Sequence, residues 1–123
     1  MKVLYIAHPL EGDISGNLGR AKRWIRWAFT NFEVSPVADW VLLATIFDDR
    51  GMWSRDRFLK ADVSLVEKCD GILLTGGRIS PGMEIERLAA LRAGISVIDL
   101  TRFGPEPPNP NLVEELALLL RTP

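Results

Sequence analysis

The chain contains very few of the residues on which several classes of protein depend. It has one cysteine, Cys69, and one histidine, His8, at distant positions. A disulfide framework needs paired cysteines and a Cys/His zinc site needs clustered ligands, so both are excluded. Cys69 lies within a helical pattern, where the expected role is that of a small buried apolar group.

Long apolar runs and an excess of one charge are also missing. Fifteen basic and sixteen acidic residues give a formal net charge of −1, so neither nucleic acid nor an anionic membrane is an expected partner. The longest apolar runs, such as 40–44, are far shorter than the roughly 20 residues of a membrane-spanning helix. Met1 leads directly into a strand-like segment rather than a signal peptide, which favours a soluble cytoplasmic protein.

The chain does contain enough apolar material for a core. Hydrophobic residues make up 47% of the 123 residues, and a chain of this length can bury roughly two thirds of its unfolded surface. No internal repeat is found, so residues 1–123 are expected to form a single domain.

Short β-prone runs alternate with helical patterns along the chain. This alternation predicts an α/β sandwich with a mainly parallel sheet, in which ligands collect beyond the carboxyl ends of the strands. The segment 36–47 fits a helix or a buried strand, and its alanines favour the helix. Strands are expected at 3–7, 71–75 and 95–100, and helices from Ser15 or Asn17 to Phe32, from Met52 or Ser54 to Lys68, from Ser80 to Gly94 and over 112–120.

Two carboxylates lie on the apolar faces of neighbouring predicted helices. When the helix after Ser80 is unrolled at about 100° per residue, Glu86 is the only charged residue near the centre of its small-residue stripe. Asp62 similarly shares the apolar arc of Val66 and Cys69. A carboxylate buried without a partner costs on the order of several kcal/mol, so these positions need an explanation.

Each acid taken alone has a structural explanation, at the rim of its stripe or in an ion pair with Arg78 or Arg55. Two inward-facing acids on adjacent helices favour one shared cleft, which satisfies both polar groups. The amide dipoles near the start of its helix favour the ionised form of Glu86, as a nucleophile requires. Asp62 lies in the C-terminal half of its helix, where a protonated, acid-like role is expected.

The ordered set of motifs at these residues resembles the nucleoside 2-deoxyribosyltransferase superfamily, which includes the 2′-deoxynucleoside 5′-monophosphate N-glycosidases. The motifs are an aspartate on a helix, Asp62, a second acid opening the next strand, Asp70, and the S-x-G-x-x-x-E pattern over 80–86. The opening Tyr5-Ile6-Ala7-His8-Pro9 is similar to the first strand and substrate loop of the superfamily. The matching blocks cover about half of the chain, with 36–53 unmatched.

The resemblance implies a Rossmann-like three-layer sandwich, assembled as a homodimer or a higher homo-oligomer, that acts on a small nucleotide or nucleoside without cofactor or metal. Glu86 would attack C1′ of a (deoxy)ribose and release the base, giving a covalent glycosyl-enzyme. Asp62 would protonate or orient the leaving base. Ser80 and the first amides of the helix, which attract anions, would hold the sugar or a 5′-phosphate. The implied substrate-binding residues are Tyr5, His8, Pro9, Asn17, Asp70, Arg78, Ser80, Gly82 and Met83.

The chain also departs from the pattern of the superfamily. Many members carry another carboxylate before the serine, where this chain has Thr75 and the glycine pair 76–77. Transferases borrow an asparagine from the C-terminal region of a partner subunit, and Asn109 and Asn111 are candidates. The short chain and its phosphate-friendly loop favour a hydrolase over base exchange. The alternatives are a nucleoside 2-deoxyribosyltransferase, a non-catalytic nucleotide-binding or sensing module, and a structural subunit with ion-paired acids.

Several other residues have both a functional and a structural interpretation. His8 follows the first strand, where it can contact substrate or simply end the strand. The aromatic faces of Trp40 and Trp53 can stack a nucleobase, although packing in the core or at a subunit interface is the favoured interpretation. Trp24 and Trp27 share a helix with basic residues, and exposure of this pair would indicate a subunit interface.

Overall fold

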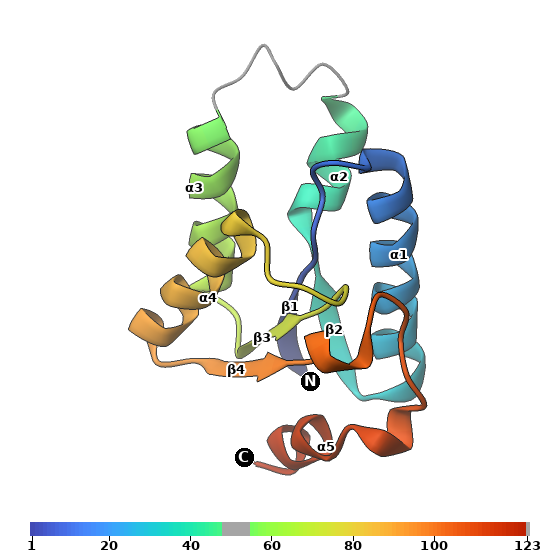
Figure 1. Ribbon diagram of the computed structural model, residues 1–123. Helices are drawn as coiled ribbons and strands as arrows, with labels where there is room; N and C mark the ends of the chain where they lie inside the picture. The colour runs from blue at the N-terminus through green and yellow to red at the C-terminus, as the bar shows by residue number, and fades with distance from the viewer. Residues whose placement is uncertain (48–54, 123) are drawn as a thin grey trace.

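Strands and helices alternate along the computed structural model, which describes residues 1–47 and 55–122 (Figure 1). The strands are β1 (Lys2–Ala7), β2 (Val34–Val37), β3 (Gly71–Leu74) and β4 (Ser96–Asp99). The helices are α1 (Ile14–Asn31), α2 (Asp39–Ile46), α3 (Arg55–Val66), α4 (Pro81–Ala93) and α5 (Glu114–Arg121), and short 3-10 turns lie at Thr101–Phe103 and Pro110–Leu112.

The four strands of the described residues form one parallel sheet in the order β2-β1-β3-β4. Leu4 of β1 pairs with Pro36 of β2 on one side and with Gly71 of β3 on the other. Because all strands run in the same direction, the loops that follow β1 and β3 emerge at the same edge of the sheet. The predicted α/β class with a parallel sheet is confirmed.

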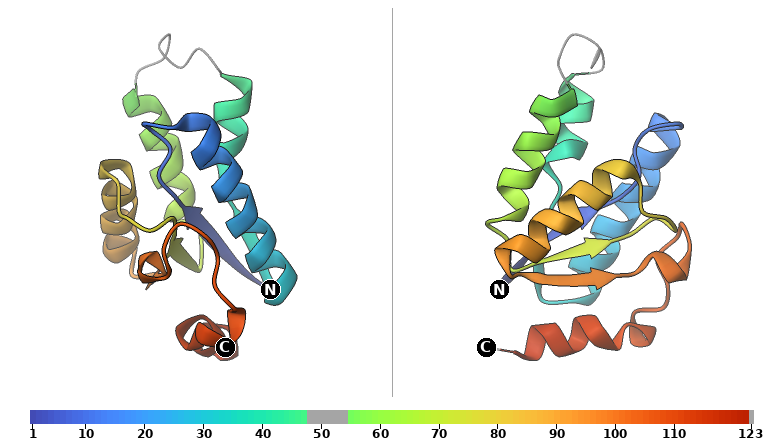
Figure 2. Two further views of the ribbon diagram at one scale, coloured as in Figure 1. Left: turned by 45° about the vertical axis from the view of Figure 1, so that its right-hand side comes forward. Right: turned by 60° about the vertical axis from the view of Figure 1, so that its left-hand side comes forward.

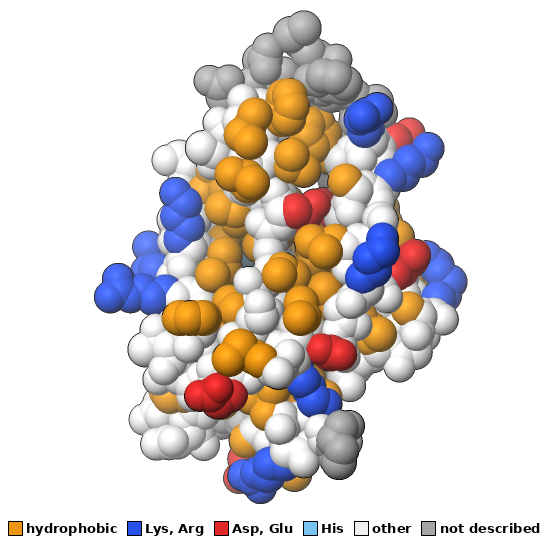
Figure 3. Space-filling view, turned by 180° about the vertical axis from the view of Figure 1, so that it is seen from behind, with side chains coloured by type: hydrophobic (Ala, Val, Ile, Leu, Met, Phe, Trp, Pro, Cys, Tyr) orange, Lys and Arg blue, Asp and Glu red, His pale blue; other side chains and the backbone are white. Residues whose placement is uncertain are grey.

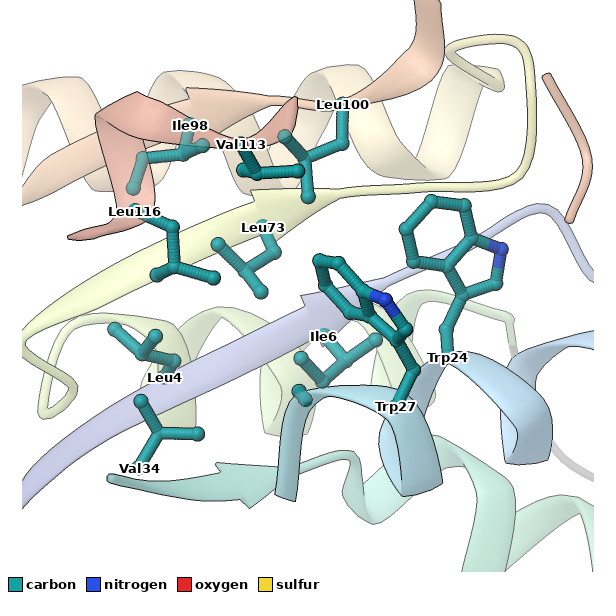
Figure 4. Packing of buried hydrophobic residues seen from close by; sticks show 11 residues of the cluster. Leu4, Ile6, Trp24, Trp27, Val34, Leu73, Ile98, Leu100, Val113 and Leu116 are labelled. Carbon is teal, nitrogen blue, oxygen red and sulfur yellow. The ribbon is translucent and has the colours of Figure 1, made fainter. Parts of the chain in front are cut away.

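Each face of the sheet is covered by its own set of helices (Figure 2). Side chains alternate along a strand, so Leu4 and Ile6 of β1 pack on one face and Tyr5 and Ala7 on the other. The first face packs against α1 and α5 through the cluster drawn in Figure 4, and the second against α2, α3 and α4. These layers make a Rossmann-like three-layer sandwich, as expected.

The start and end of α4 follow from three residues. Ser80 is the N-cap, with its side chain accepting a hydrogen bond from the Met83 amide at 3.2 Å, and Pro81 opens the first turn. Gly94 ends the helix in the left-handed conformation at φ 73°, which glycine adopts without steric cost. Both predicted boundaries are confirmed, and they fix where Glu86 lies along the helix.

One prediction for the first half of the chain is wrong, and another is confirmed only in part. The N-cap of α1 is Asp13 rather than Ser15 or Asn17, because its side chain accepts a hydrogen bond from the Gly16 amide at 3.1 Å. In the segment 36–47, where a helix was favoured over a strand, residues 39–46 form α2, whereas residues 36–37 belong to the end of β2. Pro36 is tolerated in β2 because, among the described strands, β2 lies at the edge of the sheet and pairs only with β1.

Trp24 and Trp27 are buried rather than exposed. Their rings pack edge to face with centroids 5.4 Å apart, and each indole Nε1 donates to a backbone carbonyl 2.8 Å away, that of Pro105 or Pro108. The pair therefore belongs to the core and offers no exposed aromatic surface to a partner subunit. Long-range hydrogen bonds to residues more than 80 positions away could not be foreseen from the local pattern.

Two further expectations are only partly described. The predicted start of the second helix, at Met52 or Ser54, and Trp53 lie outside the described residues. Nothing is described of the Arg55 side chain either. Within 1–47 and 55–122, the helices are all too short or too polar to cross a bilayer.

Candidate active site

A pocket of about 320 Å³ opens at the carboxyl ends of β1 and β3. It is built from the loop after β1, the start of α2, one face of α3 and the first turns of α4. Its polar lining includes His8, Trp40, Asp62, Arg78, Ser80 and Glu86. In the part of the chain that is described, no three potential metal ligands gather into a cluster.

The structure brings both inward-facing carboxylates to this pocket. Glu86 lies in the second turn of α4 and Asp62 in the middle of α3, two helices that pack against each other. Each residue is only 6% exposed, and each lines the pocket. The helical spacing that placed these acids among apolar neighbours thus aims them at one cavity.

Glu86 is held from the sheet side of the pocket by Tyr5 of β1. The Tyr5 hydroxyl donates to Glu86 Oε2 at 2.5 Å, and the fully buried Tyr5 ring lies in the core under the pocket. The hydrogen bond fixes the carboxylate and favours its ionised form, and the pKa of Tyr5 is raised well above its usual value by burial and by the Glu86 charge. Tyr5 is absent from the pocket lining, so it can position Glu86 without touching a ligand.

Burial dominates the electrostatics of Glu86. Loss of water raises the pKa of Glu86 from 4.5 to about 7, the Tyr5 hydrogen bond opposes that rise, and the charge of Asp39 adds to it. The helix dipole was expected to favour the ionised form of Glu86, but desolvation acts in the opposite direction and sets the net shift. Glu86 can both hold and release a proton near pH 7.

The start of α4 offers less free backbone than the motif suggests. The Met83 amide already donates to Ser80 Oγ, and the Ser80 amide donates to Met83 Sδ at 3.4 Å. Contrary to expectation, the Met83 amide is not available to a ligand, because it already donates to the N-cap. The Ser80 hydroxyl proton, the Gly82 backbone and the Arg78 side chain remain at the pocket as groups that are chemically able to bind an anion.

Arg78 lies at the pocket rim with an exposed side chain. No salt bridge joins it to any carboxylate of the described residues. The structural alternative, in which Arg78 neutralises Asp62, Asp70 or Glu86, is not observed. A guanidinium beside a pocket, with no salt-bridge partner among the described residues, is well placed to bind a phosphate or a carboxylate.

His8 and Trp40 form the opposite wall. Their rings are nearly parallel, with centroids 6.4 Å apart, and Trp40 Nε1 donates to the Ile6 carbonyl at 2.9 Å. His8 Nδ1 lies 2.6 Å from the Pro9 carbonyl oxygen, which can only accept, so Nδ1 carries the proton. Burial lowers the pKa of His8, which favours the neutral form of the ring.

Three other predicted binding residues lie outside the pocket lining. Asp70 precedes β3 at the far end of the sheet, where its Oδ2 accepts from the Val3 amide at 2.7 Å. Asn17 is buried at the start of α1, and its amide group donates to the Leu10 carbonyl at 2.9 Å, which shapes the loop after β1. Pro9 is buried within that loop. Asp70 thus anchors β1, whereas Asn17 and Pro9 support the pocket wall.

Sequence reasoning missed Asp39, whose charge raises the pKa values of both Glu86 and Tyr5. Asp39 opens α2 immediately after β2. The signal that could have found it is the strand itself, since a residue that follows a parallel strand lies at the ligand-binding edge of the sheet. Apolar pocket residues such as Leu10 and Phe58 carried no signal that distinguishes them from core residues.

Comparison with known proteins adds a family but no activity. The sequence profile of a family with the description Domain of unknown function (DUF7768) matches residues 2–100. This range contains the described sheet and both pocket carboxylates, and it leaves α5 outside. No curated protein and no solved structure matches the chain. The geometry of the pocket is therefore the basis on which a function can be argued.

Proposed function

The chain belongs to the DUF7768 family, whose description assigns no activity, and we propose that it cleaves the N-glycosidic bond of a (deoxy)nucleoside 5′-monophosphate. One observation carries this proposal: Glu86 and Asp62, both buried, line the same pocket from neighbouring helices. A pair of carboxylates with a cavity between them suits displacement at an anomeric carbon. The resemblance of Asp62 and the 80–86 motif to the nucleoside 2-deoxyribosyltransferase superfamily supports the same chemistry.

The reaction would proceed in two balanced steps. In the first, a Glu86 carboxylate oxygen attacks C1′, the C1′–N bond breaks, and the base leaves with the bonding electrons and a proton from the Asp62 carboxyl group. In the second, water attacks C1′ and gives a proton to Asp62. The bond between C1′ and the Glu86 oxygen breaks, so the sugar 5-phosphate is released and the Glu86 carboxylate is restored. Tyr5 would hold Glu86 in the attacking position through its 2.5 Å hydrogen bond.

The groups beside the carboxylates favour a phosphorylated substrate. Arg78 has no salt-bridge partner among the described residues, and it lines the pocket together with the N-cap of α4. The positive end of the helix and the guanidinium both attract a phosphate. The volume of about 320 Å³ falls at the small end of the range for ligand pockets, which suits a mononucleotide better than a polymer.

A nucleotide-binding module without catalysis is the second candidate. It is favoured by the pKa of about 7 for Glu86, because a partly protonated carboxyl group is a weaker nucleophile. Such a module would keep the phosphate-binding end of the pocket and the aromatic wall. Base exchange is a third outcome, in which a second base rather than water captures the glycosyl-enzyme.

Incubation with a panel of ribo- and deoxyribonucleoside 5′-monophosphates tests the proposal. We expect free base and sugar 5-phosphate from at least one member, detected by chromatography. Transfer to an added second base would assign base exchange instead. Thermal stabilisation by a monophosphate without any product would assign a binding module, and neither product nor stabilisation from a folded protein would contradict both functions.

We also propose that the chain forms a homo-oligomer through α2 and α4. Leu42 of α2 and Leu88 and Leu91 of α4 are exposed by 40% or more. Figure 3, in which no residue is labelled, shows that the face seen from behind also carries many apolar side chains. An exposed apolar surface of this kind is typical of protein interfaces. Leu88→Arg is expected to convert the oligomer to monomer in sedimentation velocity, whereas Leu118→Arg on α5 leaves it unchanged. A wild-type monomer at all concentrations would contradict this proposal.

A further inference from the structure

The segment 104–110, which we call the strap, is tied firmly to α1. Trp24 and Trp27 donate their indole Nε1 hydrogens to the carbonyls of Pro105 and Pro108, each at 2.8 Å. Glu106 forms a two-point ion pair with Arg23, with Nε to Oε2 at 2.8 Å and Nη2 to Oε1 at 2.5 Å. The strap follows β4 along the chain and lies outside the range matched by the family profile.

The strap touches the loop before α4, which carries Arg78 at the pocket. A Cβ on Gly77 would lie 3.1 Å from both Gly104 C and Pro105 N, so the two backbones are in close contact. On its other side, a Cβ on Gly76 would lie 2.6 Å from Pro9 Cδ and 2.8 Å from the His8 ring. The glycine pair, with φ values of 95° and 86°, is thus held between the loop after β1 and the strap. Figure 1 shows the loop before α4 and the strap meeting beside α1.

The clamped glycines lead directly into the pocket residues. Arg78 follows Gly77, and Ser80 caps α4 two positions later. The charge of Glu106 also acts on His8, which shows that the strap lies within electrostatic reach of the pocket wall. A shift of the strap would therefore move the anion-binding groups before it moved the buried carboxylates on α3 and α4.

We propose that Glu106 is a positioning residue, which holds the strap against Gly77 and thereby places Arg78 and Ser80 for the 5′-phosphate. The substrate named in this inference rests on the proposed function. The contacts of the strap with α1 and Gly77 are observed independently of that function. The ion pair of Glu106 with Arg23 is exposed on both sides, so it adds little to global stability. Its effect is local, on the backbone of the loop before α4.

Glu106→Gln tests this role, with Glu115→Gln as the matched control. Glu115 makes an exposed ion pair of the same kind, with Arg102 at 2.5 Å, away from the pocket. We expect Glu106→Gln to raise KM for the nucleoside monophosphate about fivefold, the scale of one exposed charged hydrogen-bonded pair, with kcat unchanged. The KM for the corresponding nucleoside, which lacks the phosphate, should not change. Arg23→Gln should reproduce the effect, and Glu115→Gln should have none.

Amide hydrogen exchange gives a second readout that needs no substrate. Glu106→Gln should speed exchange at Gly77 and Arg78 relative to wild type, while exchange in β3 stays the same. Faster exchange without base release in wild type would uphold the positioning role and contradict the proposed function. Unchanged exchange, or equal losses with nucleoside and monophosphate, would overturn the positioning role and leave the proposed function standing.

Discussion

Glu86→Gln is expected to abolish base release, with kcat lowered by a factor on the order of 10³ or more, as for loss of other covalent nucleophiles. Glutamine keeps the size of the side chain and an oxygen that can accept from the Tyr5 hydroxyl, so the pocket should keep its shape. It cannot form the ester with C1′. Chromatographic assay of free base under single-turnover conditions measures the loss.

Glu84→Gln is the matched control for this variant. Glu84 lies on the same helix but pairs with Arg87 at 2.5 Å away from the buried face, and it is absent from the pocket lining. Its replacement should leave kcat within about twofold, because exposed ion pairs contribute little. Retained thermal stabilisation of Glu86→Gln by a nucleoside monophosphate would show that binding survives. Full activity in Glu86→Gln would contradict the assigned nucleophile.

Glu86→Gln is also expected to change how stability depends on pH. The folded state raises the pKa of Glu86 from 4.5 to about 7 because burial penalises the charge. Protonated Glu86 therefore favours the folded state below about pH 4.5, and that contribution is lost as the pH rises through 7. The cost of burying the ionised form is ~3 kcal/mol at pH 8 by this linkage. The variant should thus gain stability over wild type at pH 8 relative to pH 5.

Urea unfolding of both proteins at pH 5 and pH 8 measures this difference, since comparison of the two cancels the titration of other groups. Asp39→Asn offers a second check, because loss of the Asp39 charge lowers the pKa of Glu86 and should reduce the dependence of wild-type stability on pH. A stability difference between wild type and Glu86→Gln that is the same at both pH values would contradict a raised pKa. Gain of stability on loss of a functional group is common at active sites.

The local signals in the sequence were sufficient for α4 and its carboxylate. Ser80 and Gly94 each act through their own backbone and side chain, so the start and end of the helix could be read from the sequence. With its start fixed, the helical period alone places Glu86 on the buried face. The same period placed Asp62, and the α/β order of elements placed both near the ligand-binding edge of the sheet.

Features that depend on distant partners could not be read in this way. The local sequence places Trp24 and Trp27 on a helix with basic residues, which suggests exposure. In the structure both are buried, and their indole N–H groups donate to carbonyls of the strap. Asp70 fits the motif but lies at the opposite end of the sheet from the pocket, where it binds the Val3 amide. The protonation of Glu86 depends on burial and on Asp39, whose place beside it follows from the position of β2 in the sheet.

Mass spectrometry of the acid-quenched reaction tests the central claim most directly. The protein is incubated with a deoxynucleoside 5′-monophosphate that it cleaves, and the quenched protein is then digested and its peptides mapped. We expect a deoxyribosyl 5-phosphate adduct on the peptide that contains Glu86, and no adduct in Glu86→Gln. An adduct on another residue, or base release by wild type with no adduct at any quench time, would contradict covalent catalysis by Glu86.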